Sequence, residues 1–563
     1  MSDPSDPPAP PDQAGLSDSA ARVADVFDRL LAHLVQVSPV AATQLGDHSR
    51  DGDLDEWGTG EAERRLQVLA ALRRDLDAVG QPADPEVAGD AVLVGDALDG
   101  LSFELALQRS PQRDPLFYLG LATTAVHDLI RRDDLPAGPR MAAAARRAAQ
   151  VPRLLAQAQA ALTEIPEPSR RLALLRLPGA IALFEDVLPG FASEAAEAGA
   201  GAAQACRSFG AWLEAIEGPY PDWRLGEELW GDALRLALGV RMAPQELWER
   251  ATRSLAQGQE EMERLAARVL GSSGRGLAGA DLVRAGVAAA SVDCSERRAL
   301  VSDAAGVLEE VKRFIREQGD FSLPEPDTLR VEEVPAFMRG AVVAYFVPAP
   351  PLETEAAHTY YLSPVPDDWD DERAGSFLRE YNVHALRSVG IHEAYPGHYA
   401  QLAFAQRHPR LVRRALWNSA FVEGWAVYVE RRIIAAGFGG DGADGDRLRL
   451  ISAKMEMRSI ANALLDQGMH VRGWSDEEAM SLMLDQTYQE NAEAQAKLLR
   501  AQTGAGQLST YFVGGEEMDD LRRDAEAQQG PAFTAPAFHQ AVLAQGTPPF
   551  PVLRRALLGE AAA

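Results

Sequence analysis

The sequence predicts a large, mainly α-helical protein with one small sheet. Apolar residues recur at the three- and four-residue spacing of an amphipathic helix, as in the set Val23, Val26, Phe27, Leu30, Leu31 and Leu34. Residues 60–240 are rich in Ala, Leu and Arg, and Pro and Gly interrupt their helical pattern. A strand-like texture is confined to about 328–363. The expected fold class is therefore mainly α, with a small antiparallel sheet.

The N-terminal part is expected to consist of a tail and a helical lobe. Residues 1–16 are acidic and rich in proline, a composition typical of a disordered tail. Alanine-rich runs at 142–162 and 190–206 suggest tightly packed antiparallel helices, and no fixed period indicates a solenoid. We expect roughly eight helices over 60–240, within a lobe that extends over 17–240.

The second lobe is expected over residues 241–563. Strand-like runs, which alternate or are rich in β-branched and aromatic residues, predict a sheet at about 328–363. The pattern becomes helical again from Asp371, and helices at about 377–435 carry the most informative motif. Long helices with many Glu and Arg residues are also expected at 244–270 and 297–318.

The composition is that of a soluble globular protein with an excess of acid. Its 563 residues are 46% hydrophobic and 25% charged. A chain of this length exceeds one small core, so two or three lobes are expected. The formal net charge of −28 argues against nucleic acid or an anionic membrane as a partner. It also weakly favours cationic or neutral substrates.

The cysteine content and the first residues predict a cytoplasmic protein. Cys206 and Cys294 are the only cysteines, so neither a disulfide framework nor a thiolate zinc site is expected. The start of the chain is acidic and lacks the basic and apolar regions of a signal peptide. No apolar run is long enough to predict a membrane span.

The stretch from His392 to His398 has the composition of a zinc-hydrolase motif. Glu393 follows the first histidine directly, and Glu423 lies in an otherwise apolar stretch, where a carboxylate is costly to bury unless it is coordinated or paired. Two histidines and one carboxylate leave the fourth tetrahedral position of a zinc ion open for water. We therefore expect His392, His398 and Glu423 to bind one zinc ion per chain, with Glu393 as general base.

The spacing of the two histidines differs from the standard zincin motif. In H-E-x-x-H the histidines are four residues apart on one helical face. His398 instead follows His392 by six residues, which turns the side chain by roughly 240° around a regular helix. Pro396 and Gly397 stand directly before His398 and can break the helix. We expect the two extra residues to loop out and return His398 to the metal side.

Several motifs together resemble the bacterial "domain of unknown function 885" family, and they cover almost the whole chain. Among them are segments Pro39–His48 and Gly506–Tyr511 and the motifs His392-Glu393-x-x-Pro396-Gly397-His398, Glu423-Gly424-Trp425-Ala426-x-Tyr428-x-Glu430 and Arg458-x₇-Asp466-x-Gly468-x-His470. This family looks like a distant relative of the gluzincins, the helical zinc oligopeptidases and carboxypeptidases whose third ligand is a glutamate. The resemblance implies a zincin-like catalytic lobe with a deep cleft for short peptides.

The same resemblance and the helical spacing assign roles beyond the ligands. Glu430 follows Glu423 by seven residues on one helix face and is expected to orient a histidine, or else to pair with Arg431 or Arg432. Candidate donors to the oxyanion of a tetrahedral intermediate are His470, Arg458 and Tyr511.

Two further sets of residues complete the predicted site. Helix spacing puts Asp466 near Arg458 and His470, where it would hold the histidine in a donating tautomer or form a structural ion pair. Tyr360 and Tyr361 are candidates for the substrate-binding edge, but a strand alternates its faces, so at most one of them points at the metal.

The favoured function is a zinc-dependent metallopeptidase that hydrolyses short peptides. One alternative keeps the metal but acts on the amide of a non-peptide or modified amino-acid conjugate. Another is an inactive helical binding or scaffold protein, if the insertion between His392 and His398 disrupts the ligand geometry. Manganese or cobalt would fit similar ligands. The sequence does not indicate which peptide terminus is recognised or the oligomeric state.

Overall fold

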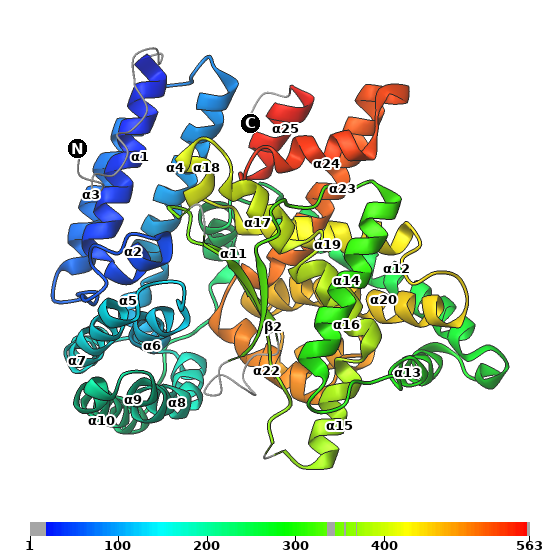
Figure 1. The fold of residues 1–563 in the computed structure, drawn as a ribbon, viewed down its shortest axis with the longest axis horizontal. Helices are drawn as coiled ribbons and strands as arrows, with labels where there is room; N and C mark the ends of the chain where they lie inside the picture. The colour runs from blue at the N-terminus through cyan, green and yellow to red at the C-terminus, as the bar shows by residue number, and fades with distance from the viewer. Residues whose placement is uncertain (1–17, 335–343, 354–355, 368, 560–563) are drawn as a thin grey trace.

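A computed structural model of the chain describes residues 18–334, 344–353, 356–367 and 369–559. Helices dominate these ranges, and three short strands form one sheet, which confirms the mainly α prediction. The tail predicted at 1–16 lies outside the described residues. In Figure 1 the N-terminal helices lie on the left of the molecule and most of the later helices lie on the right. In the described ranges no helix is both long enough and apolar enough to cross a bilayer.

The N-terminal helices enclose a first hydrophobic core, which includes buried side chains from Ala20 to Leu213. Alanines buried on α7 and α10 let these two helices pack against each other, as the alanine-rich runs predict. The helices are α1 (Asp18–Val37), α2 (Pro39–Leu45), α3 (Glu61–Asp77), α4 (Pro85–Phe103), α5 (Ser110–Arg113), α6 (Pro115–Arg131), α7 (Ala137–Ala161), α8 (Glu167–Ala182), α9 (Leu188–Phe191) and α10 (Ala196–Glu214).

A second, separate core begins at Trp230 and extends to Leu553. Its longest helix is α20, in which every residue from Ile460 to His470 is buried. The helices are α11 (Gly226–Asp232), α12 (Pro244–Leu270), α13 (Gly279–Ala290), α14 (Leu300–Gln318), α15 (Asp371–Glu380), α16 (Val383–Glu393), α17 (His398–Gln406), α18 (Leu411–Ala415), α19 (Ser419–Ala435), α20 (Ala443–His470), α21 (Asp476–Ser481), α22 (Asn491–Thr503), α23 (Thr510–Gln529), α24 (Ala535–Leu543) and α25 (Phe550–Leu558).

Single turns of π- or 3₁₀-helix extend or join these elements. They are η1 (Glu104–Gln108), η2 (Leu183–Val187), η3 (Ser193–Ala195), η4 (Ala233–Ala237), η5 (Gly271–Gly274), η7 (Leu482–Gln486), η8 (Gln507–Ser509) and η9 (Gly530–Ala532).

The two cores meet where α18 packs on α4. Arg413 of α18 is almost fully buried, and its Nε donates a hydrogen bond of 2.6 Å to Oδ1 of Asp90 on α4. Arg410 forms an ion pair with the other oxygen of the same carboxylate. A buried carboxylate with two guanidinium partners ties the lobes together, because neither charge can be left unpaired without a large cost.

The small sheet is present at the predicted place, but it is mixed rather than antiparallel. The strands are β1 (Leu329–Glu333), β2 (Ala344–Val347) and β3 (His358–Leu362), in the order β1-β3-β2. β2 pairs with β3 in antiparallel fashion, whereas β1 pairs with β3 in parallel. Each strand runs opposite to the strand before it in the chain, so β1 and β3 run in the same direction. They form a parallel pair because β3 lies between β1 and β2. All residues of this central strand are buried.

Helices α19 and α23 cross in backbone contact through two glycines. A Cβ atom at Gly424 would lie 2.3 Å from the carbonyl carbon of Gly514, and one at Gly514 would lie 1.9 Å from the Ala420 oxygen. Real Cβ atoms do not approach backbone this closely, so both positions require glycine. The crossing brings the first turn of α23, which begins at Thr510, alongside Glu423.

Gly424→Ala is expected to destabilise the protein strongly. The added methyl group meets main-chain atoms rather than a movable side chain, so the free energy of unfolding should fall by roughly 1–3 kcal/mol or more. Thermal denaturation followed by circular dichroism would measure the change. Gly201→Ala is the matched control, because it also adds a methyl to a helix but meets no neighbouring atom. An unchanged apparent Tm for Gly424→Ala would contradict the described crossing.

Candidate metal centre

The helix that carries His392 ends one residue after it, as the spacing of the motif predicts. Asn382 caps the start of α16 by accepting hydrogen bonds from two backbone amides, and the helix stops at Glu393. A new helix, α17, begins at His398. The loop between them folds back, and the Gly397 amide donates to the Ile391 carbonyl at 3.0 Å. The two extra residues are thus accommodated by a break between helices.

Gly397 and Trp425 hold this loop in place. A Cβ at Gly397 would lie 1.9 Å from the His392 carbonyl oxygen, so only glycine allows the loop to return so closely to α16. From α19, the indole Nε1 of Trp425 donates to the Pro396 carbonyl at 2.8 Å. The residue two positions after Glu423 therefore fixes the loop that sets the direction of His398.

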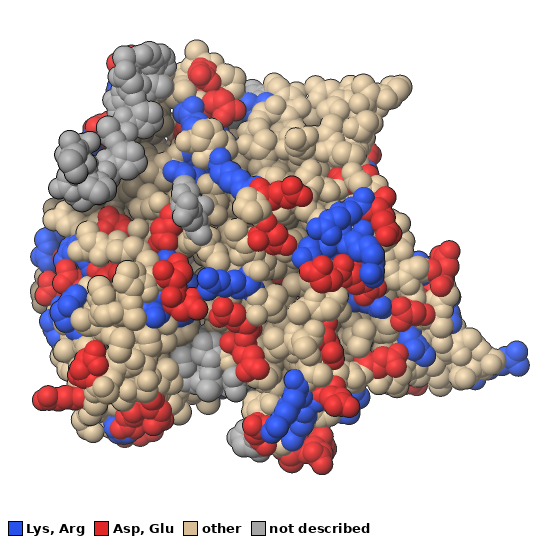
Figure 2. All heavy atoms as spheres, in the orientation of Figure 1, with Lys and Arg blue, Asp and Glu red and all other residues tan. Residues whose placement is uncertain are grey.

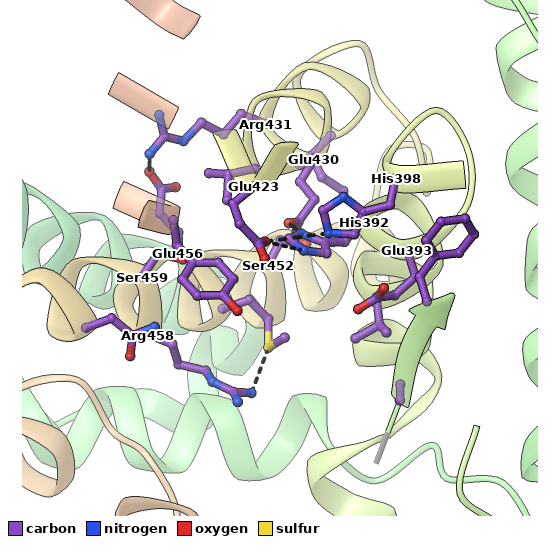
Figure 3. A pocket seen from close by; sticks show the side chains of 18 of the residues that line it. His392, Glu393, His398, Glu423, Glu430, Arg431, Ser452, Glu456, Arg458 and Ser459 are labelled. Atoms are coloured by element: carbon purple, nitrogen blue, oxygen red, sulfur yellow. Dashed lines mark hydrogen bonds and ion pairs between the residues drawn. The ribbon is translucent and has the colours of Figure 1, made fainter. Parts of the chain in front are cut away.

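His392, His398 and Glu423 converge on one point. Their nearest ligand atoms lie within 4.8 Å of one another. Oε2 of Glu423 lies 3.4 Å from Nε2 of His392 and 3.5 Å from Nε2 of His398. Figure 3 shows the three side chains pointing toward one another from two helices and the start of a third. The break therefore brings together the three residues that the sequence predicts as ligands.

The distances and the buried carboxylate fit a zinc ion. Ligand atoms placed about 2.0–2.1 Å from a tetrahedral zinc ion are about 3.3–3.4 Å apart, close to the two distances from Glu423. Oε2 of Glu423 is buried, and in the described residues its contacts are with the two imidazoles. A carboxylate buried between two imidazoles is costly unless protons or a metal cation neutralise its charge. The set of two imidazoles and one carboxylate is also the set that catalytic zinc prefers.

Burial and mutual charge set the protonation of this cluster. Burial alone would raise the pKa of Glu423, but the imidazoles of His392 and His398 lower it well below its usual range. Burial would lower the pKa of His392, but the carboxylates of Glu423 and Glu430 raise it well above its usual value. His392 and Glu423 thus hold each other in charged forms, and a divalent cation would replace the His392 imidazole proton.

Glu430 supports the first ligand. Its Oε1 lies 2.6 Å from Nδ1 of His392. The other ring nitrogen of His392, Nε2, faces Glu423. A carboxylate on Nδ1 fixes the ring orientation and the tautomer, leaving Nε2 free to bind a metal. The predicted orienting role for Glu430 is consistent with this geometry, whereas Arg431 pairs with Asp519 instead.

Glu430→Gln is expected to weaken zinc binding by about 10- to 100-fold, because the amide cannot match the carboxylate as an acceptor from Nδ1. Competition with a chromophoric zinc chelator would measure the affinity. Glu456→Gln provides a comparison, since Glu456 also lines the cavity but pairs with Arg431. Equal zinc affinity in Glu430→Gln and the unaltered protein would rule out the orienting role.

Glu393 lies beside the ligands without joining them. It lines the same cavity, and its carboxylate accepts no hydrogen bond from the described residues. In the view of Figure 3 the carboxylate lies between the ligand cluster and the strand. Burial raises the pKa of Glu393, and the neighbouring imidazoles offset part of that rise. A carboxylate with a raised pKa is suited to accept and return a proton near neutral pH.

The ligands open onto a cavity of about 750 Å³ in the second lobe. Tyr511, on the first turn of α23, lines it, and the Glu423 charge is the main cause that raises the pKa of Tyr511. Arg458 also lines it but forms ion pairs with Glu493 and Glu380. In Figure 3, Arg458 lies apart from the two histidines. Of these two candidate donors, Tyr511 is therefore the closer to the ligands.

Comparison with known proteins places the chain in a family and gives its fold further support. The model of a family described as bacterial proteins of unknown function (DUF885) matches residues 39–557. The chain belongs to this family. No curated protein matches it significantly.

Two solved structures share the fold of this DUF885 protein over almost its whole length. A candidate lipoprotein of unknown function from Shewanella oneidensis is 26% identical, has a TM-score of 0.79, and the match covers 96% of this chain and 100% of that one. A candidate lipoprotein from Colwellia psychrerythraea is 18% identical with a TM-score of 0.77, over 97% and 99% of the two chains. The helical architecture thus recurs in other bacteria.

The predicted pair of His470 and Asp466 lies outside the metal cavity of the DUF885 protein. His470 packs edge-on against Trp223, and its Nε2 lies 2.8 Å from the Ala501 carbonyl oxygen. Asp466 accepts hydrogen bonds from the Trp230 indole, the Gly506 amide and the Ser509 hydroxyl. The expected oxyanion role for His470 is therefore corrected. Helix spacing puts the two side chains together but does not fix which side of α20 faces the cavity.

Tyr360 and Tyr361 lie on opposite faces of β3. The Tyr360 hydroxyl is buried without a hydrogen-bond partner, and after burial the Glu393 charge is the next cause that raises the pKa of Tyr360. Tyr361 stacks on Tyr345, with ring centroids 4.9 Å apart. Burial and then the charge of Glu332 raise the pKa of Tyr361. Neither tyrosine lines the cavity, which corrects the position predicted for them; residues of the neighbouring strand β2 line it instead.

Sequence reasoning missed a set of polar residues on the wall opposite the ligands. From α20 they recur at three- and four-residue intervals, which is a signal for one exposed helix face. From α22 no motif marks them. These residues are Ser452, Glu456, Ser459, Asn462, Lys497 and Arg500.

Proposed function

We propose that this DUF885 protein is a zinc-dependent hydrolase of the gluzincin type that cleaves short peptides. The observation that carries the proposal is the convergence of His392, His398 and Glu423, with distances from the Glu423 carboxylate to both imidazoles that suit zinc. An inactive scaffold would have no reason to bury a carboxylate between two imidazoles, since its burial costs free energy.

The chain's own groups supply the proton transfers of amide hydrolysis. Bound zinc would lower the pKa of a coordinated water and polarise the substrate carbonyl. Glu393, with its raised pKa and free carboxylate, would accept a proton from the attacking water and pass it to the leaving amine. His392 is held in position by Glu430 throughout.

Tyr511 is the chain's best-placed donor to the developing oxyanion. Tyr511 lines the cavity one helical turn before Gly514, which packs on Gly424 next to Glu423 at the α19–α23 crossing. Burial and the Glu423 charge keep the phenol protonated, as a hydrogen-bond donor must be. Arg458 already pairs with Glu493, so it contributes to the charge of the wall rather than to this hydrogen bond.

The shape of the cavity favours an extended, short substrate. Ala344, Tyr345 and Phe346 of strand β2 line it, so a peptide in extended form would lie alongside a strand. A cavity of about 750 Å³ holds a ligand of a few residues and excludes a folded protein.

The alternative substrate is a non-peptide amide or a modified amino-acid conjugate, because the same ligands and base hydrolyse any amide that fits. The proposed location is the cytoplasm, where the free thiols of Cys206 and Cys294 would stay reduced. The description of similar structures as candidate lipoproteins favours a membrane-attached location instead. Fractionation of cells that produce the full-length protein would distinguish the two locations.

Digestion of a mixed library of short peptides tests the proposal. Zinc-loaded protein should cleave a subset of the library, a chelator should abolish the cleavage, and added zinc should restore it. Mass spectrometry of the products would identify the bonds that are cut. Stoichiometric zinc without cleavage of any peptide, together with turnover of another amide, would favour the amidase. A protein that takes up no zinc would refute both.

A further inference from the structure

The wall of the cavity formed by α20 and α22 is positively charged, although the protein as a whole carries a net charge of −28. On the face shown in Figure 2, acidic and basic side chains are intermingled. In the described residues, Arg458 and Lys497 of this wall, together with Lys454 behind it, share two carboxylates, Glu380 and Glu493. Neither of these carboxylates lines the cavity, whereas Arg458 and Lys497 do.

Arg500 adds a further positive charge that no carboxylate neutralises. It lies one helical turn after Lys497 and lines the cavity, but no acidic side chain of the described residues pairs with it. The other arginines that line the cavity, Arg431, Arg449 and Arg458, each pair with at least one carboxylate. Arg500 is thus the cavity arginine whose charge remains available.

Neighbouring side chains hold the Arg500 guanidinium in a defined position. Its Nη2 donates to Oε1 of Gln507 at 2.6 Å and to the Tyr511 hydroxyl at 3.5 Å. These contacts use one nitrogen of a group that has five N–H donors on three nitrogens. The remaining donors can therefore form the paired hydrogen bonds by which arginine binds a carboxylate.

Lys497 strengthens the same region, but its charge is not permanent. Burial and the adjacent Arg458 lower the pKa of Lys497 to about 7, although Glu493 opposes the change. A guanidinium stays protonated at every physiological pH. Arg500 is therefore the group in this wall that binds an anion independently of pH.

Only one side chain separates Arg500 from the metal ligands. Tyr511 contacts Arg500 at its hydroxyl, and it lies one helical turn before Gly514, which packs against Gly424 next to Glu423. One residue of an extended peptide spans about 3.3–3.6 Å. A group bound by Arg500 would therefore lie within one or two residues of the bond at the ligand cluster.

We propose that Arg500 binds a free carboxylate of the substrate, and that the favoured substrates are short peptides or acylated amino acids cleaved within one or two residues of a free C-terminal carboxylate. This inference rests on the proposed function for the position of the cleaved bond, but the carboxylate site itself does not depend on hydrolysis. An acidic side chain offers the same chemistry, so the test must separate it from the C-terminus.

Calorimetric binding to the zinc-loaded Glu393→Gln variant measures this recognition without hydrolysis. The probes are N-acetyl-Ala-Ala-Ala as the acid, the same peptide as its C-terminal amide, and N-acetyl-Ala-Ala-Glu amide. The acid should bind about 10- to 100-fold more tightly than the amide, the range expected for hydrogen bonds between charged groups. Tight binding of the Glu-containing amide instead would assign the site to an acidic side chain and overturn C-terminal recognition.

Added substitutions decide whether Arg500 is responsible. Arg500→Gln should remove the preference for the acid, and Arg500→Lys should restore part of it. Arg449→Gln is the control, because Arg449 lines the cavity but already pairs with Asp446, and it should leave the preference intact. The preference should also persist after chelation, which excludes direct binding of the carboxylate by zinc. A preference that survives Arg500→Gln would overturn the proposal.

The outcome is separable from that of the proposed function. If the unaltered zinc-loaded protein cleaves the acid and the amide with equal kcat/KM, the peptidase stands and the carboxylate site fails. If the acid binds in an Arg500-dependent manner but no peptide is cleaved, the carboxylate site stands and the peptidase fails.

Discussion

Glu393→Gln is expected to abolish hydrolysis while leaving zinc binding intact. Glutamine has nearly the same shape but cannot accept and return a proton, so kcat should fall by about 10²- to 10⁴-fold. Among the described residues, Glu393 forms no hydrogen bond or ion pair with the three proposed ligands, so the zinc content should remain that of the unaltered protein. Steady-state kinetics and metal analysis on the same sample would test both statements.

Glu261→Gln is a suitable control for this experiment. Glu261 lines the same cavity, but it forms an ion pair with Arg264 one helical turn away. The proposed mechanism gives Glu261 no part in proton transfer. It should retain nearly full activity. A fall in zinc content parallel to the loss of activity in Glu393→Gln would instead indicate that Glu393 has a structural role.

His398→Ala is expected to remove most of the zinc. Structural zinc sites with four protein ligands contribute about 10–16 kcal/mol in all, so one ligand accounts for about 3–4 kcal/mol, or roughly 10²- to 10³-fold in affinity. Elemental analysis after dialysis against a weak chelator should find about one zinc per chain in the unaltered protein and little in the variant.

Thermal denaturation gives a second, independent measure of the same loss. A ligand that binds only the folded protein raises Tm by an amount that grows with the logarithm of its concentration divided by its Kd. Added zinc should therefore raise the apparent Tm of the unaltered protein but not that of His398→Ala. His33→Ala, on α1 in the N-terminal lobe, should behave like the unaltered protein. An equal response to zinc in both variants would show that His398 is not a ligand.

The helical architecture could be predicted from the sequence because each helix carries its own periodic apolar face. The expected helix at 244–270 coincides with α12, and the expected one at 297–318 differs from α14 only at its start. The direction of β1 relative to β3 could not be predicted in the same way. A parallel pair forms only if β1 and β3 are neighbours in the sheet, and which strands are neighbours is set by packing against the rest of the lobe.

The convergence of His392, His398 and Glu423 could also be predicted, because Pro396 and Gly397 mark the helix break between the two histidines. The opposite wall could not. Which side of a long buried helix faces a cavity is decided by its neighbours, as the inward packing of His470 and the cavity-lining position of Ser459 on the same helix show. No sequence motif marks Arg500. It differs from the other cavity arginines because no acidic side chain of the described residues pairs with it.

The break between α16 and α17 changes how such sites are to be found in other genomes. A search that demands four-residue spacing between the histidines passes over this chain, although its ligands converge as well as those of a single helix would. A more inclusive pattern would accept two histidines six positions apart with Pro-Gly before the second, and a glutamate followed by glycine about 25 positions later. Uncharacterised bacterial proteins with that pattern become candidates for the same chemistry.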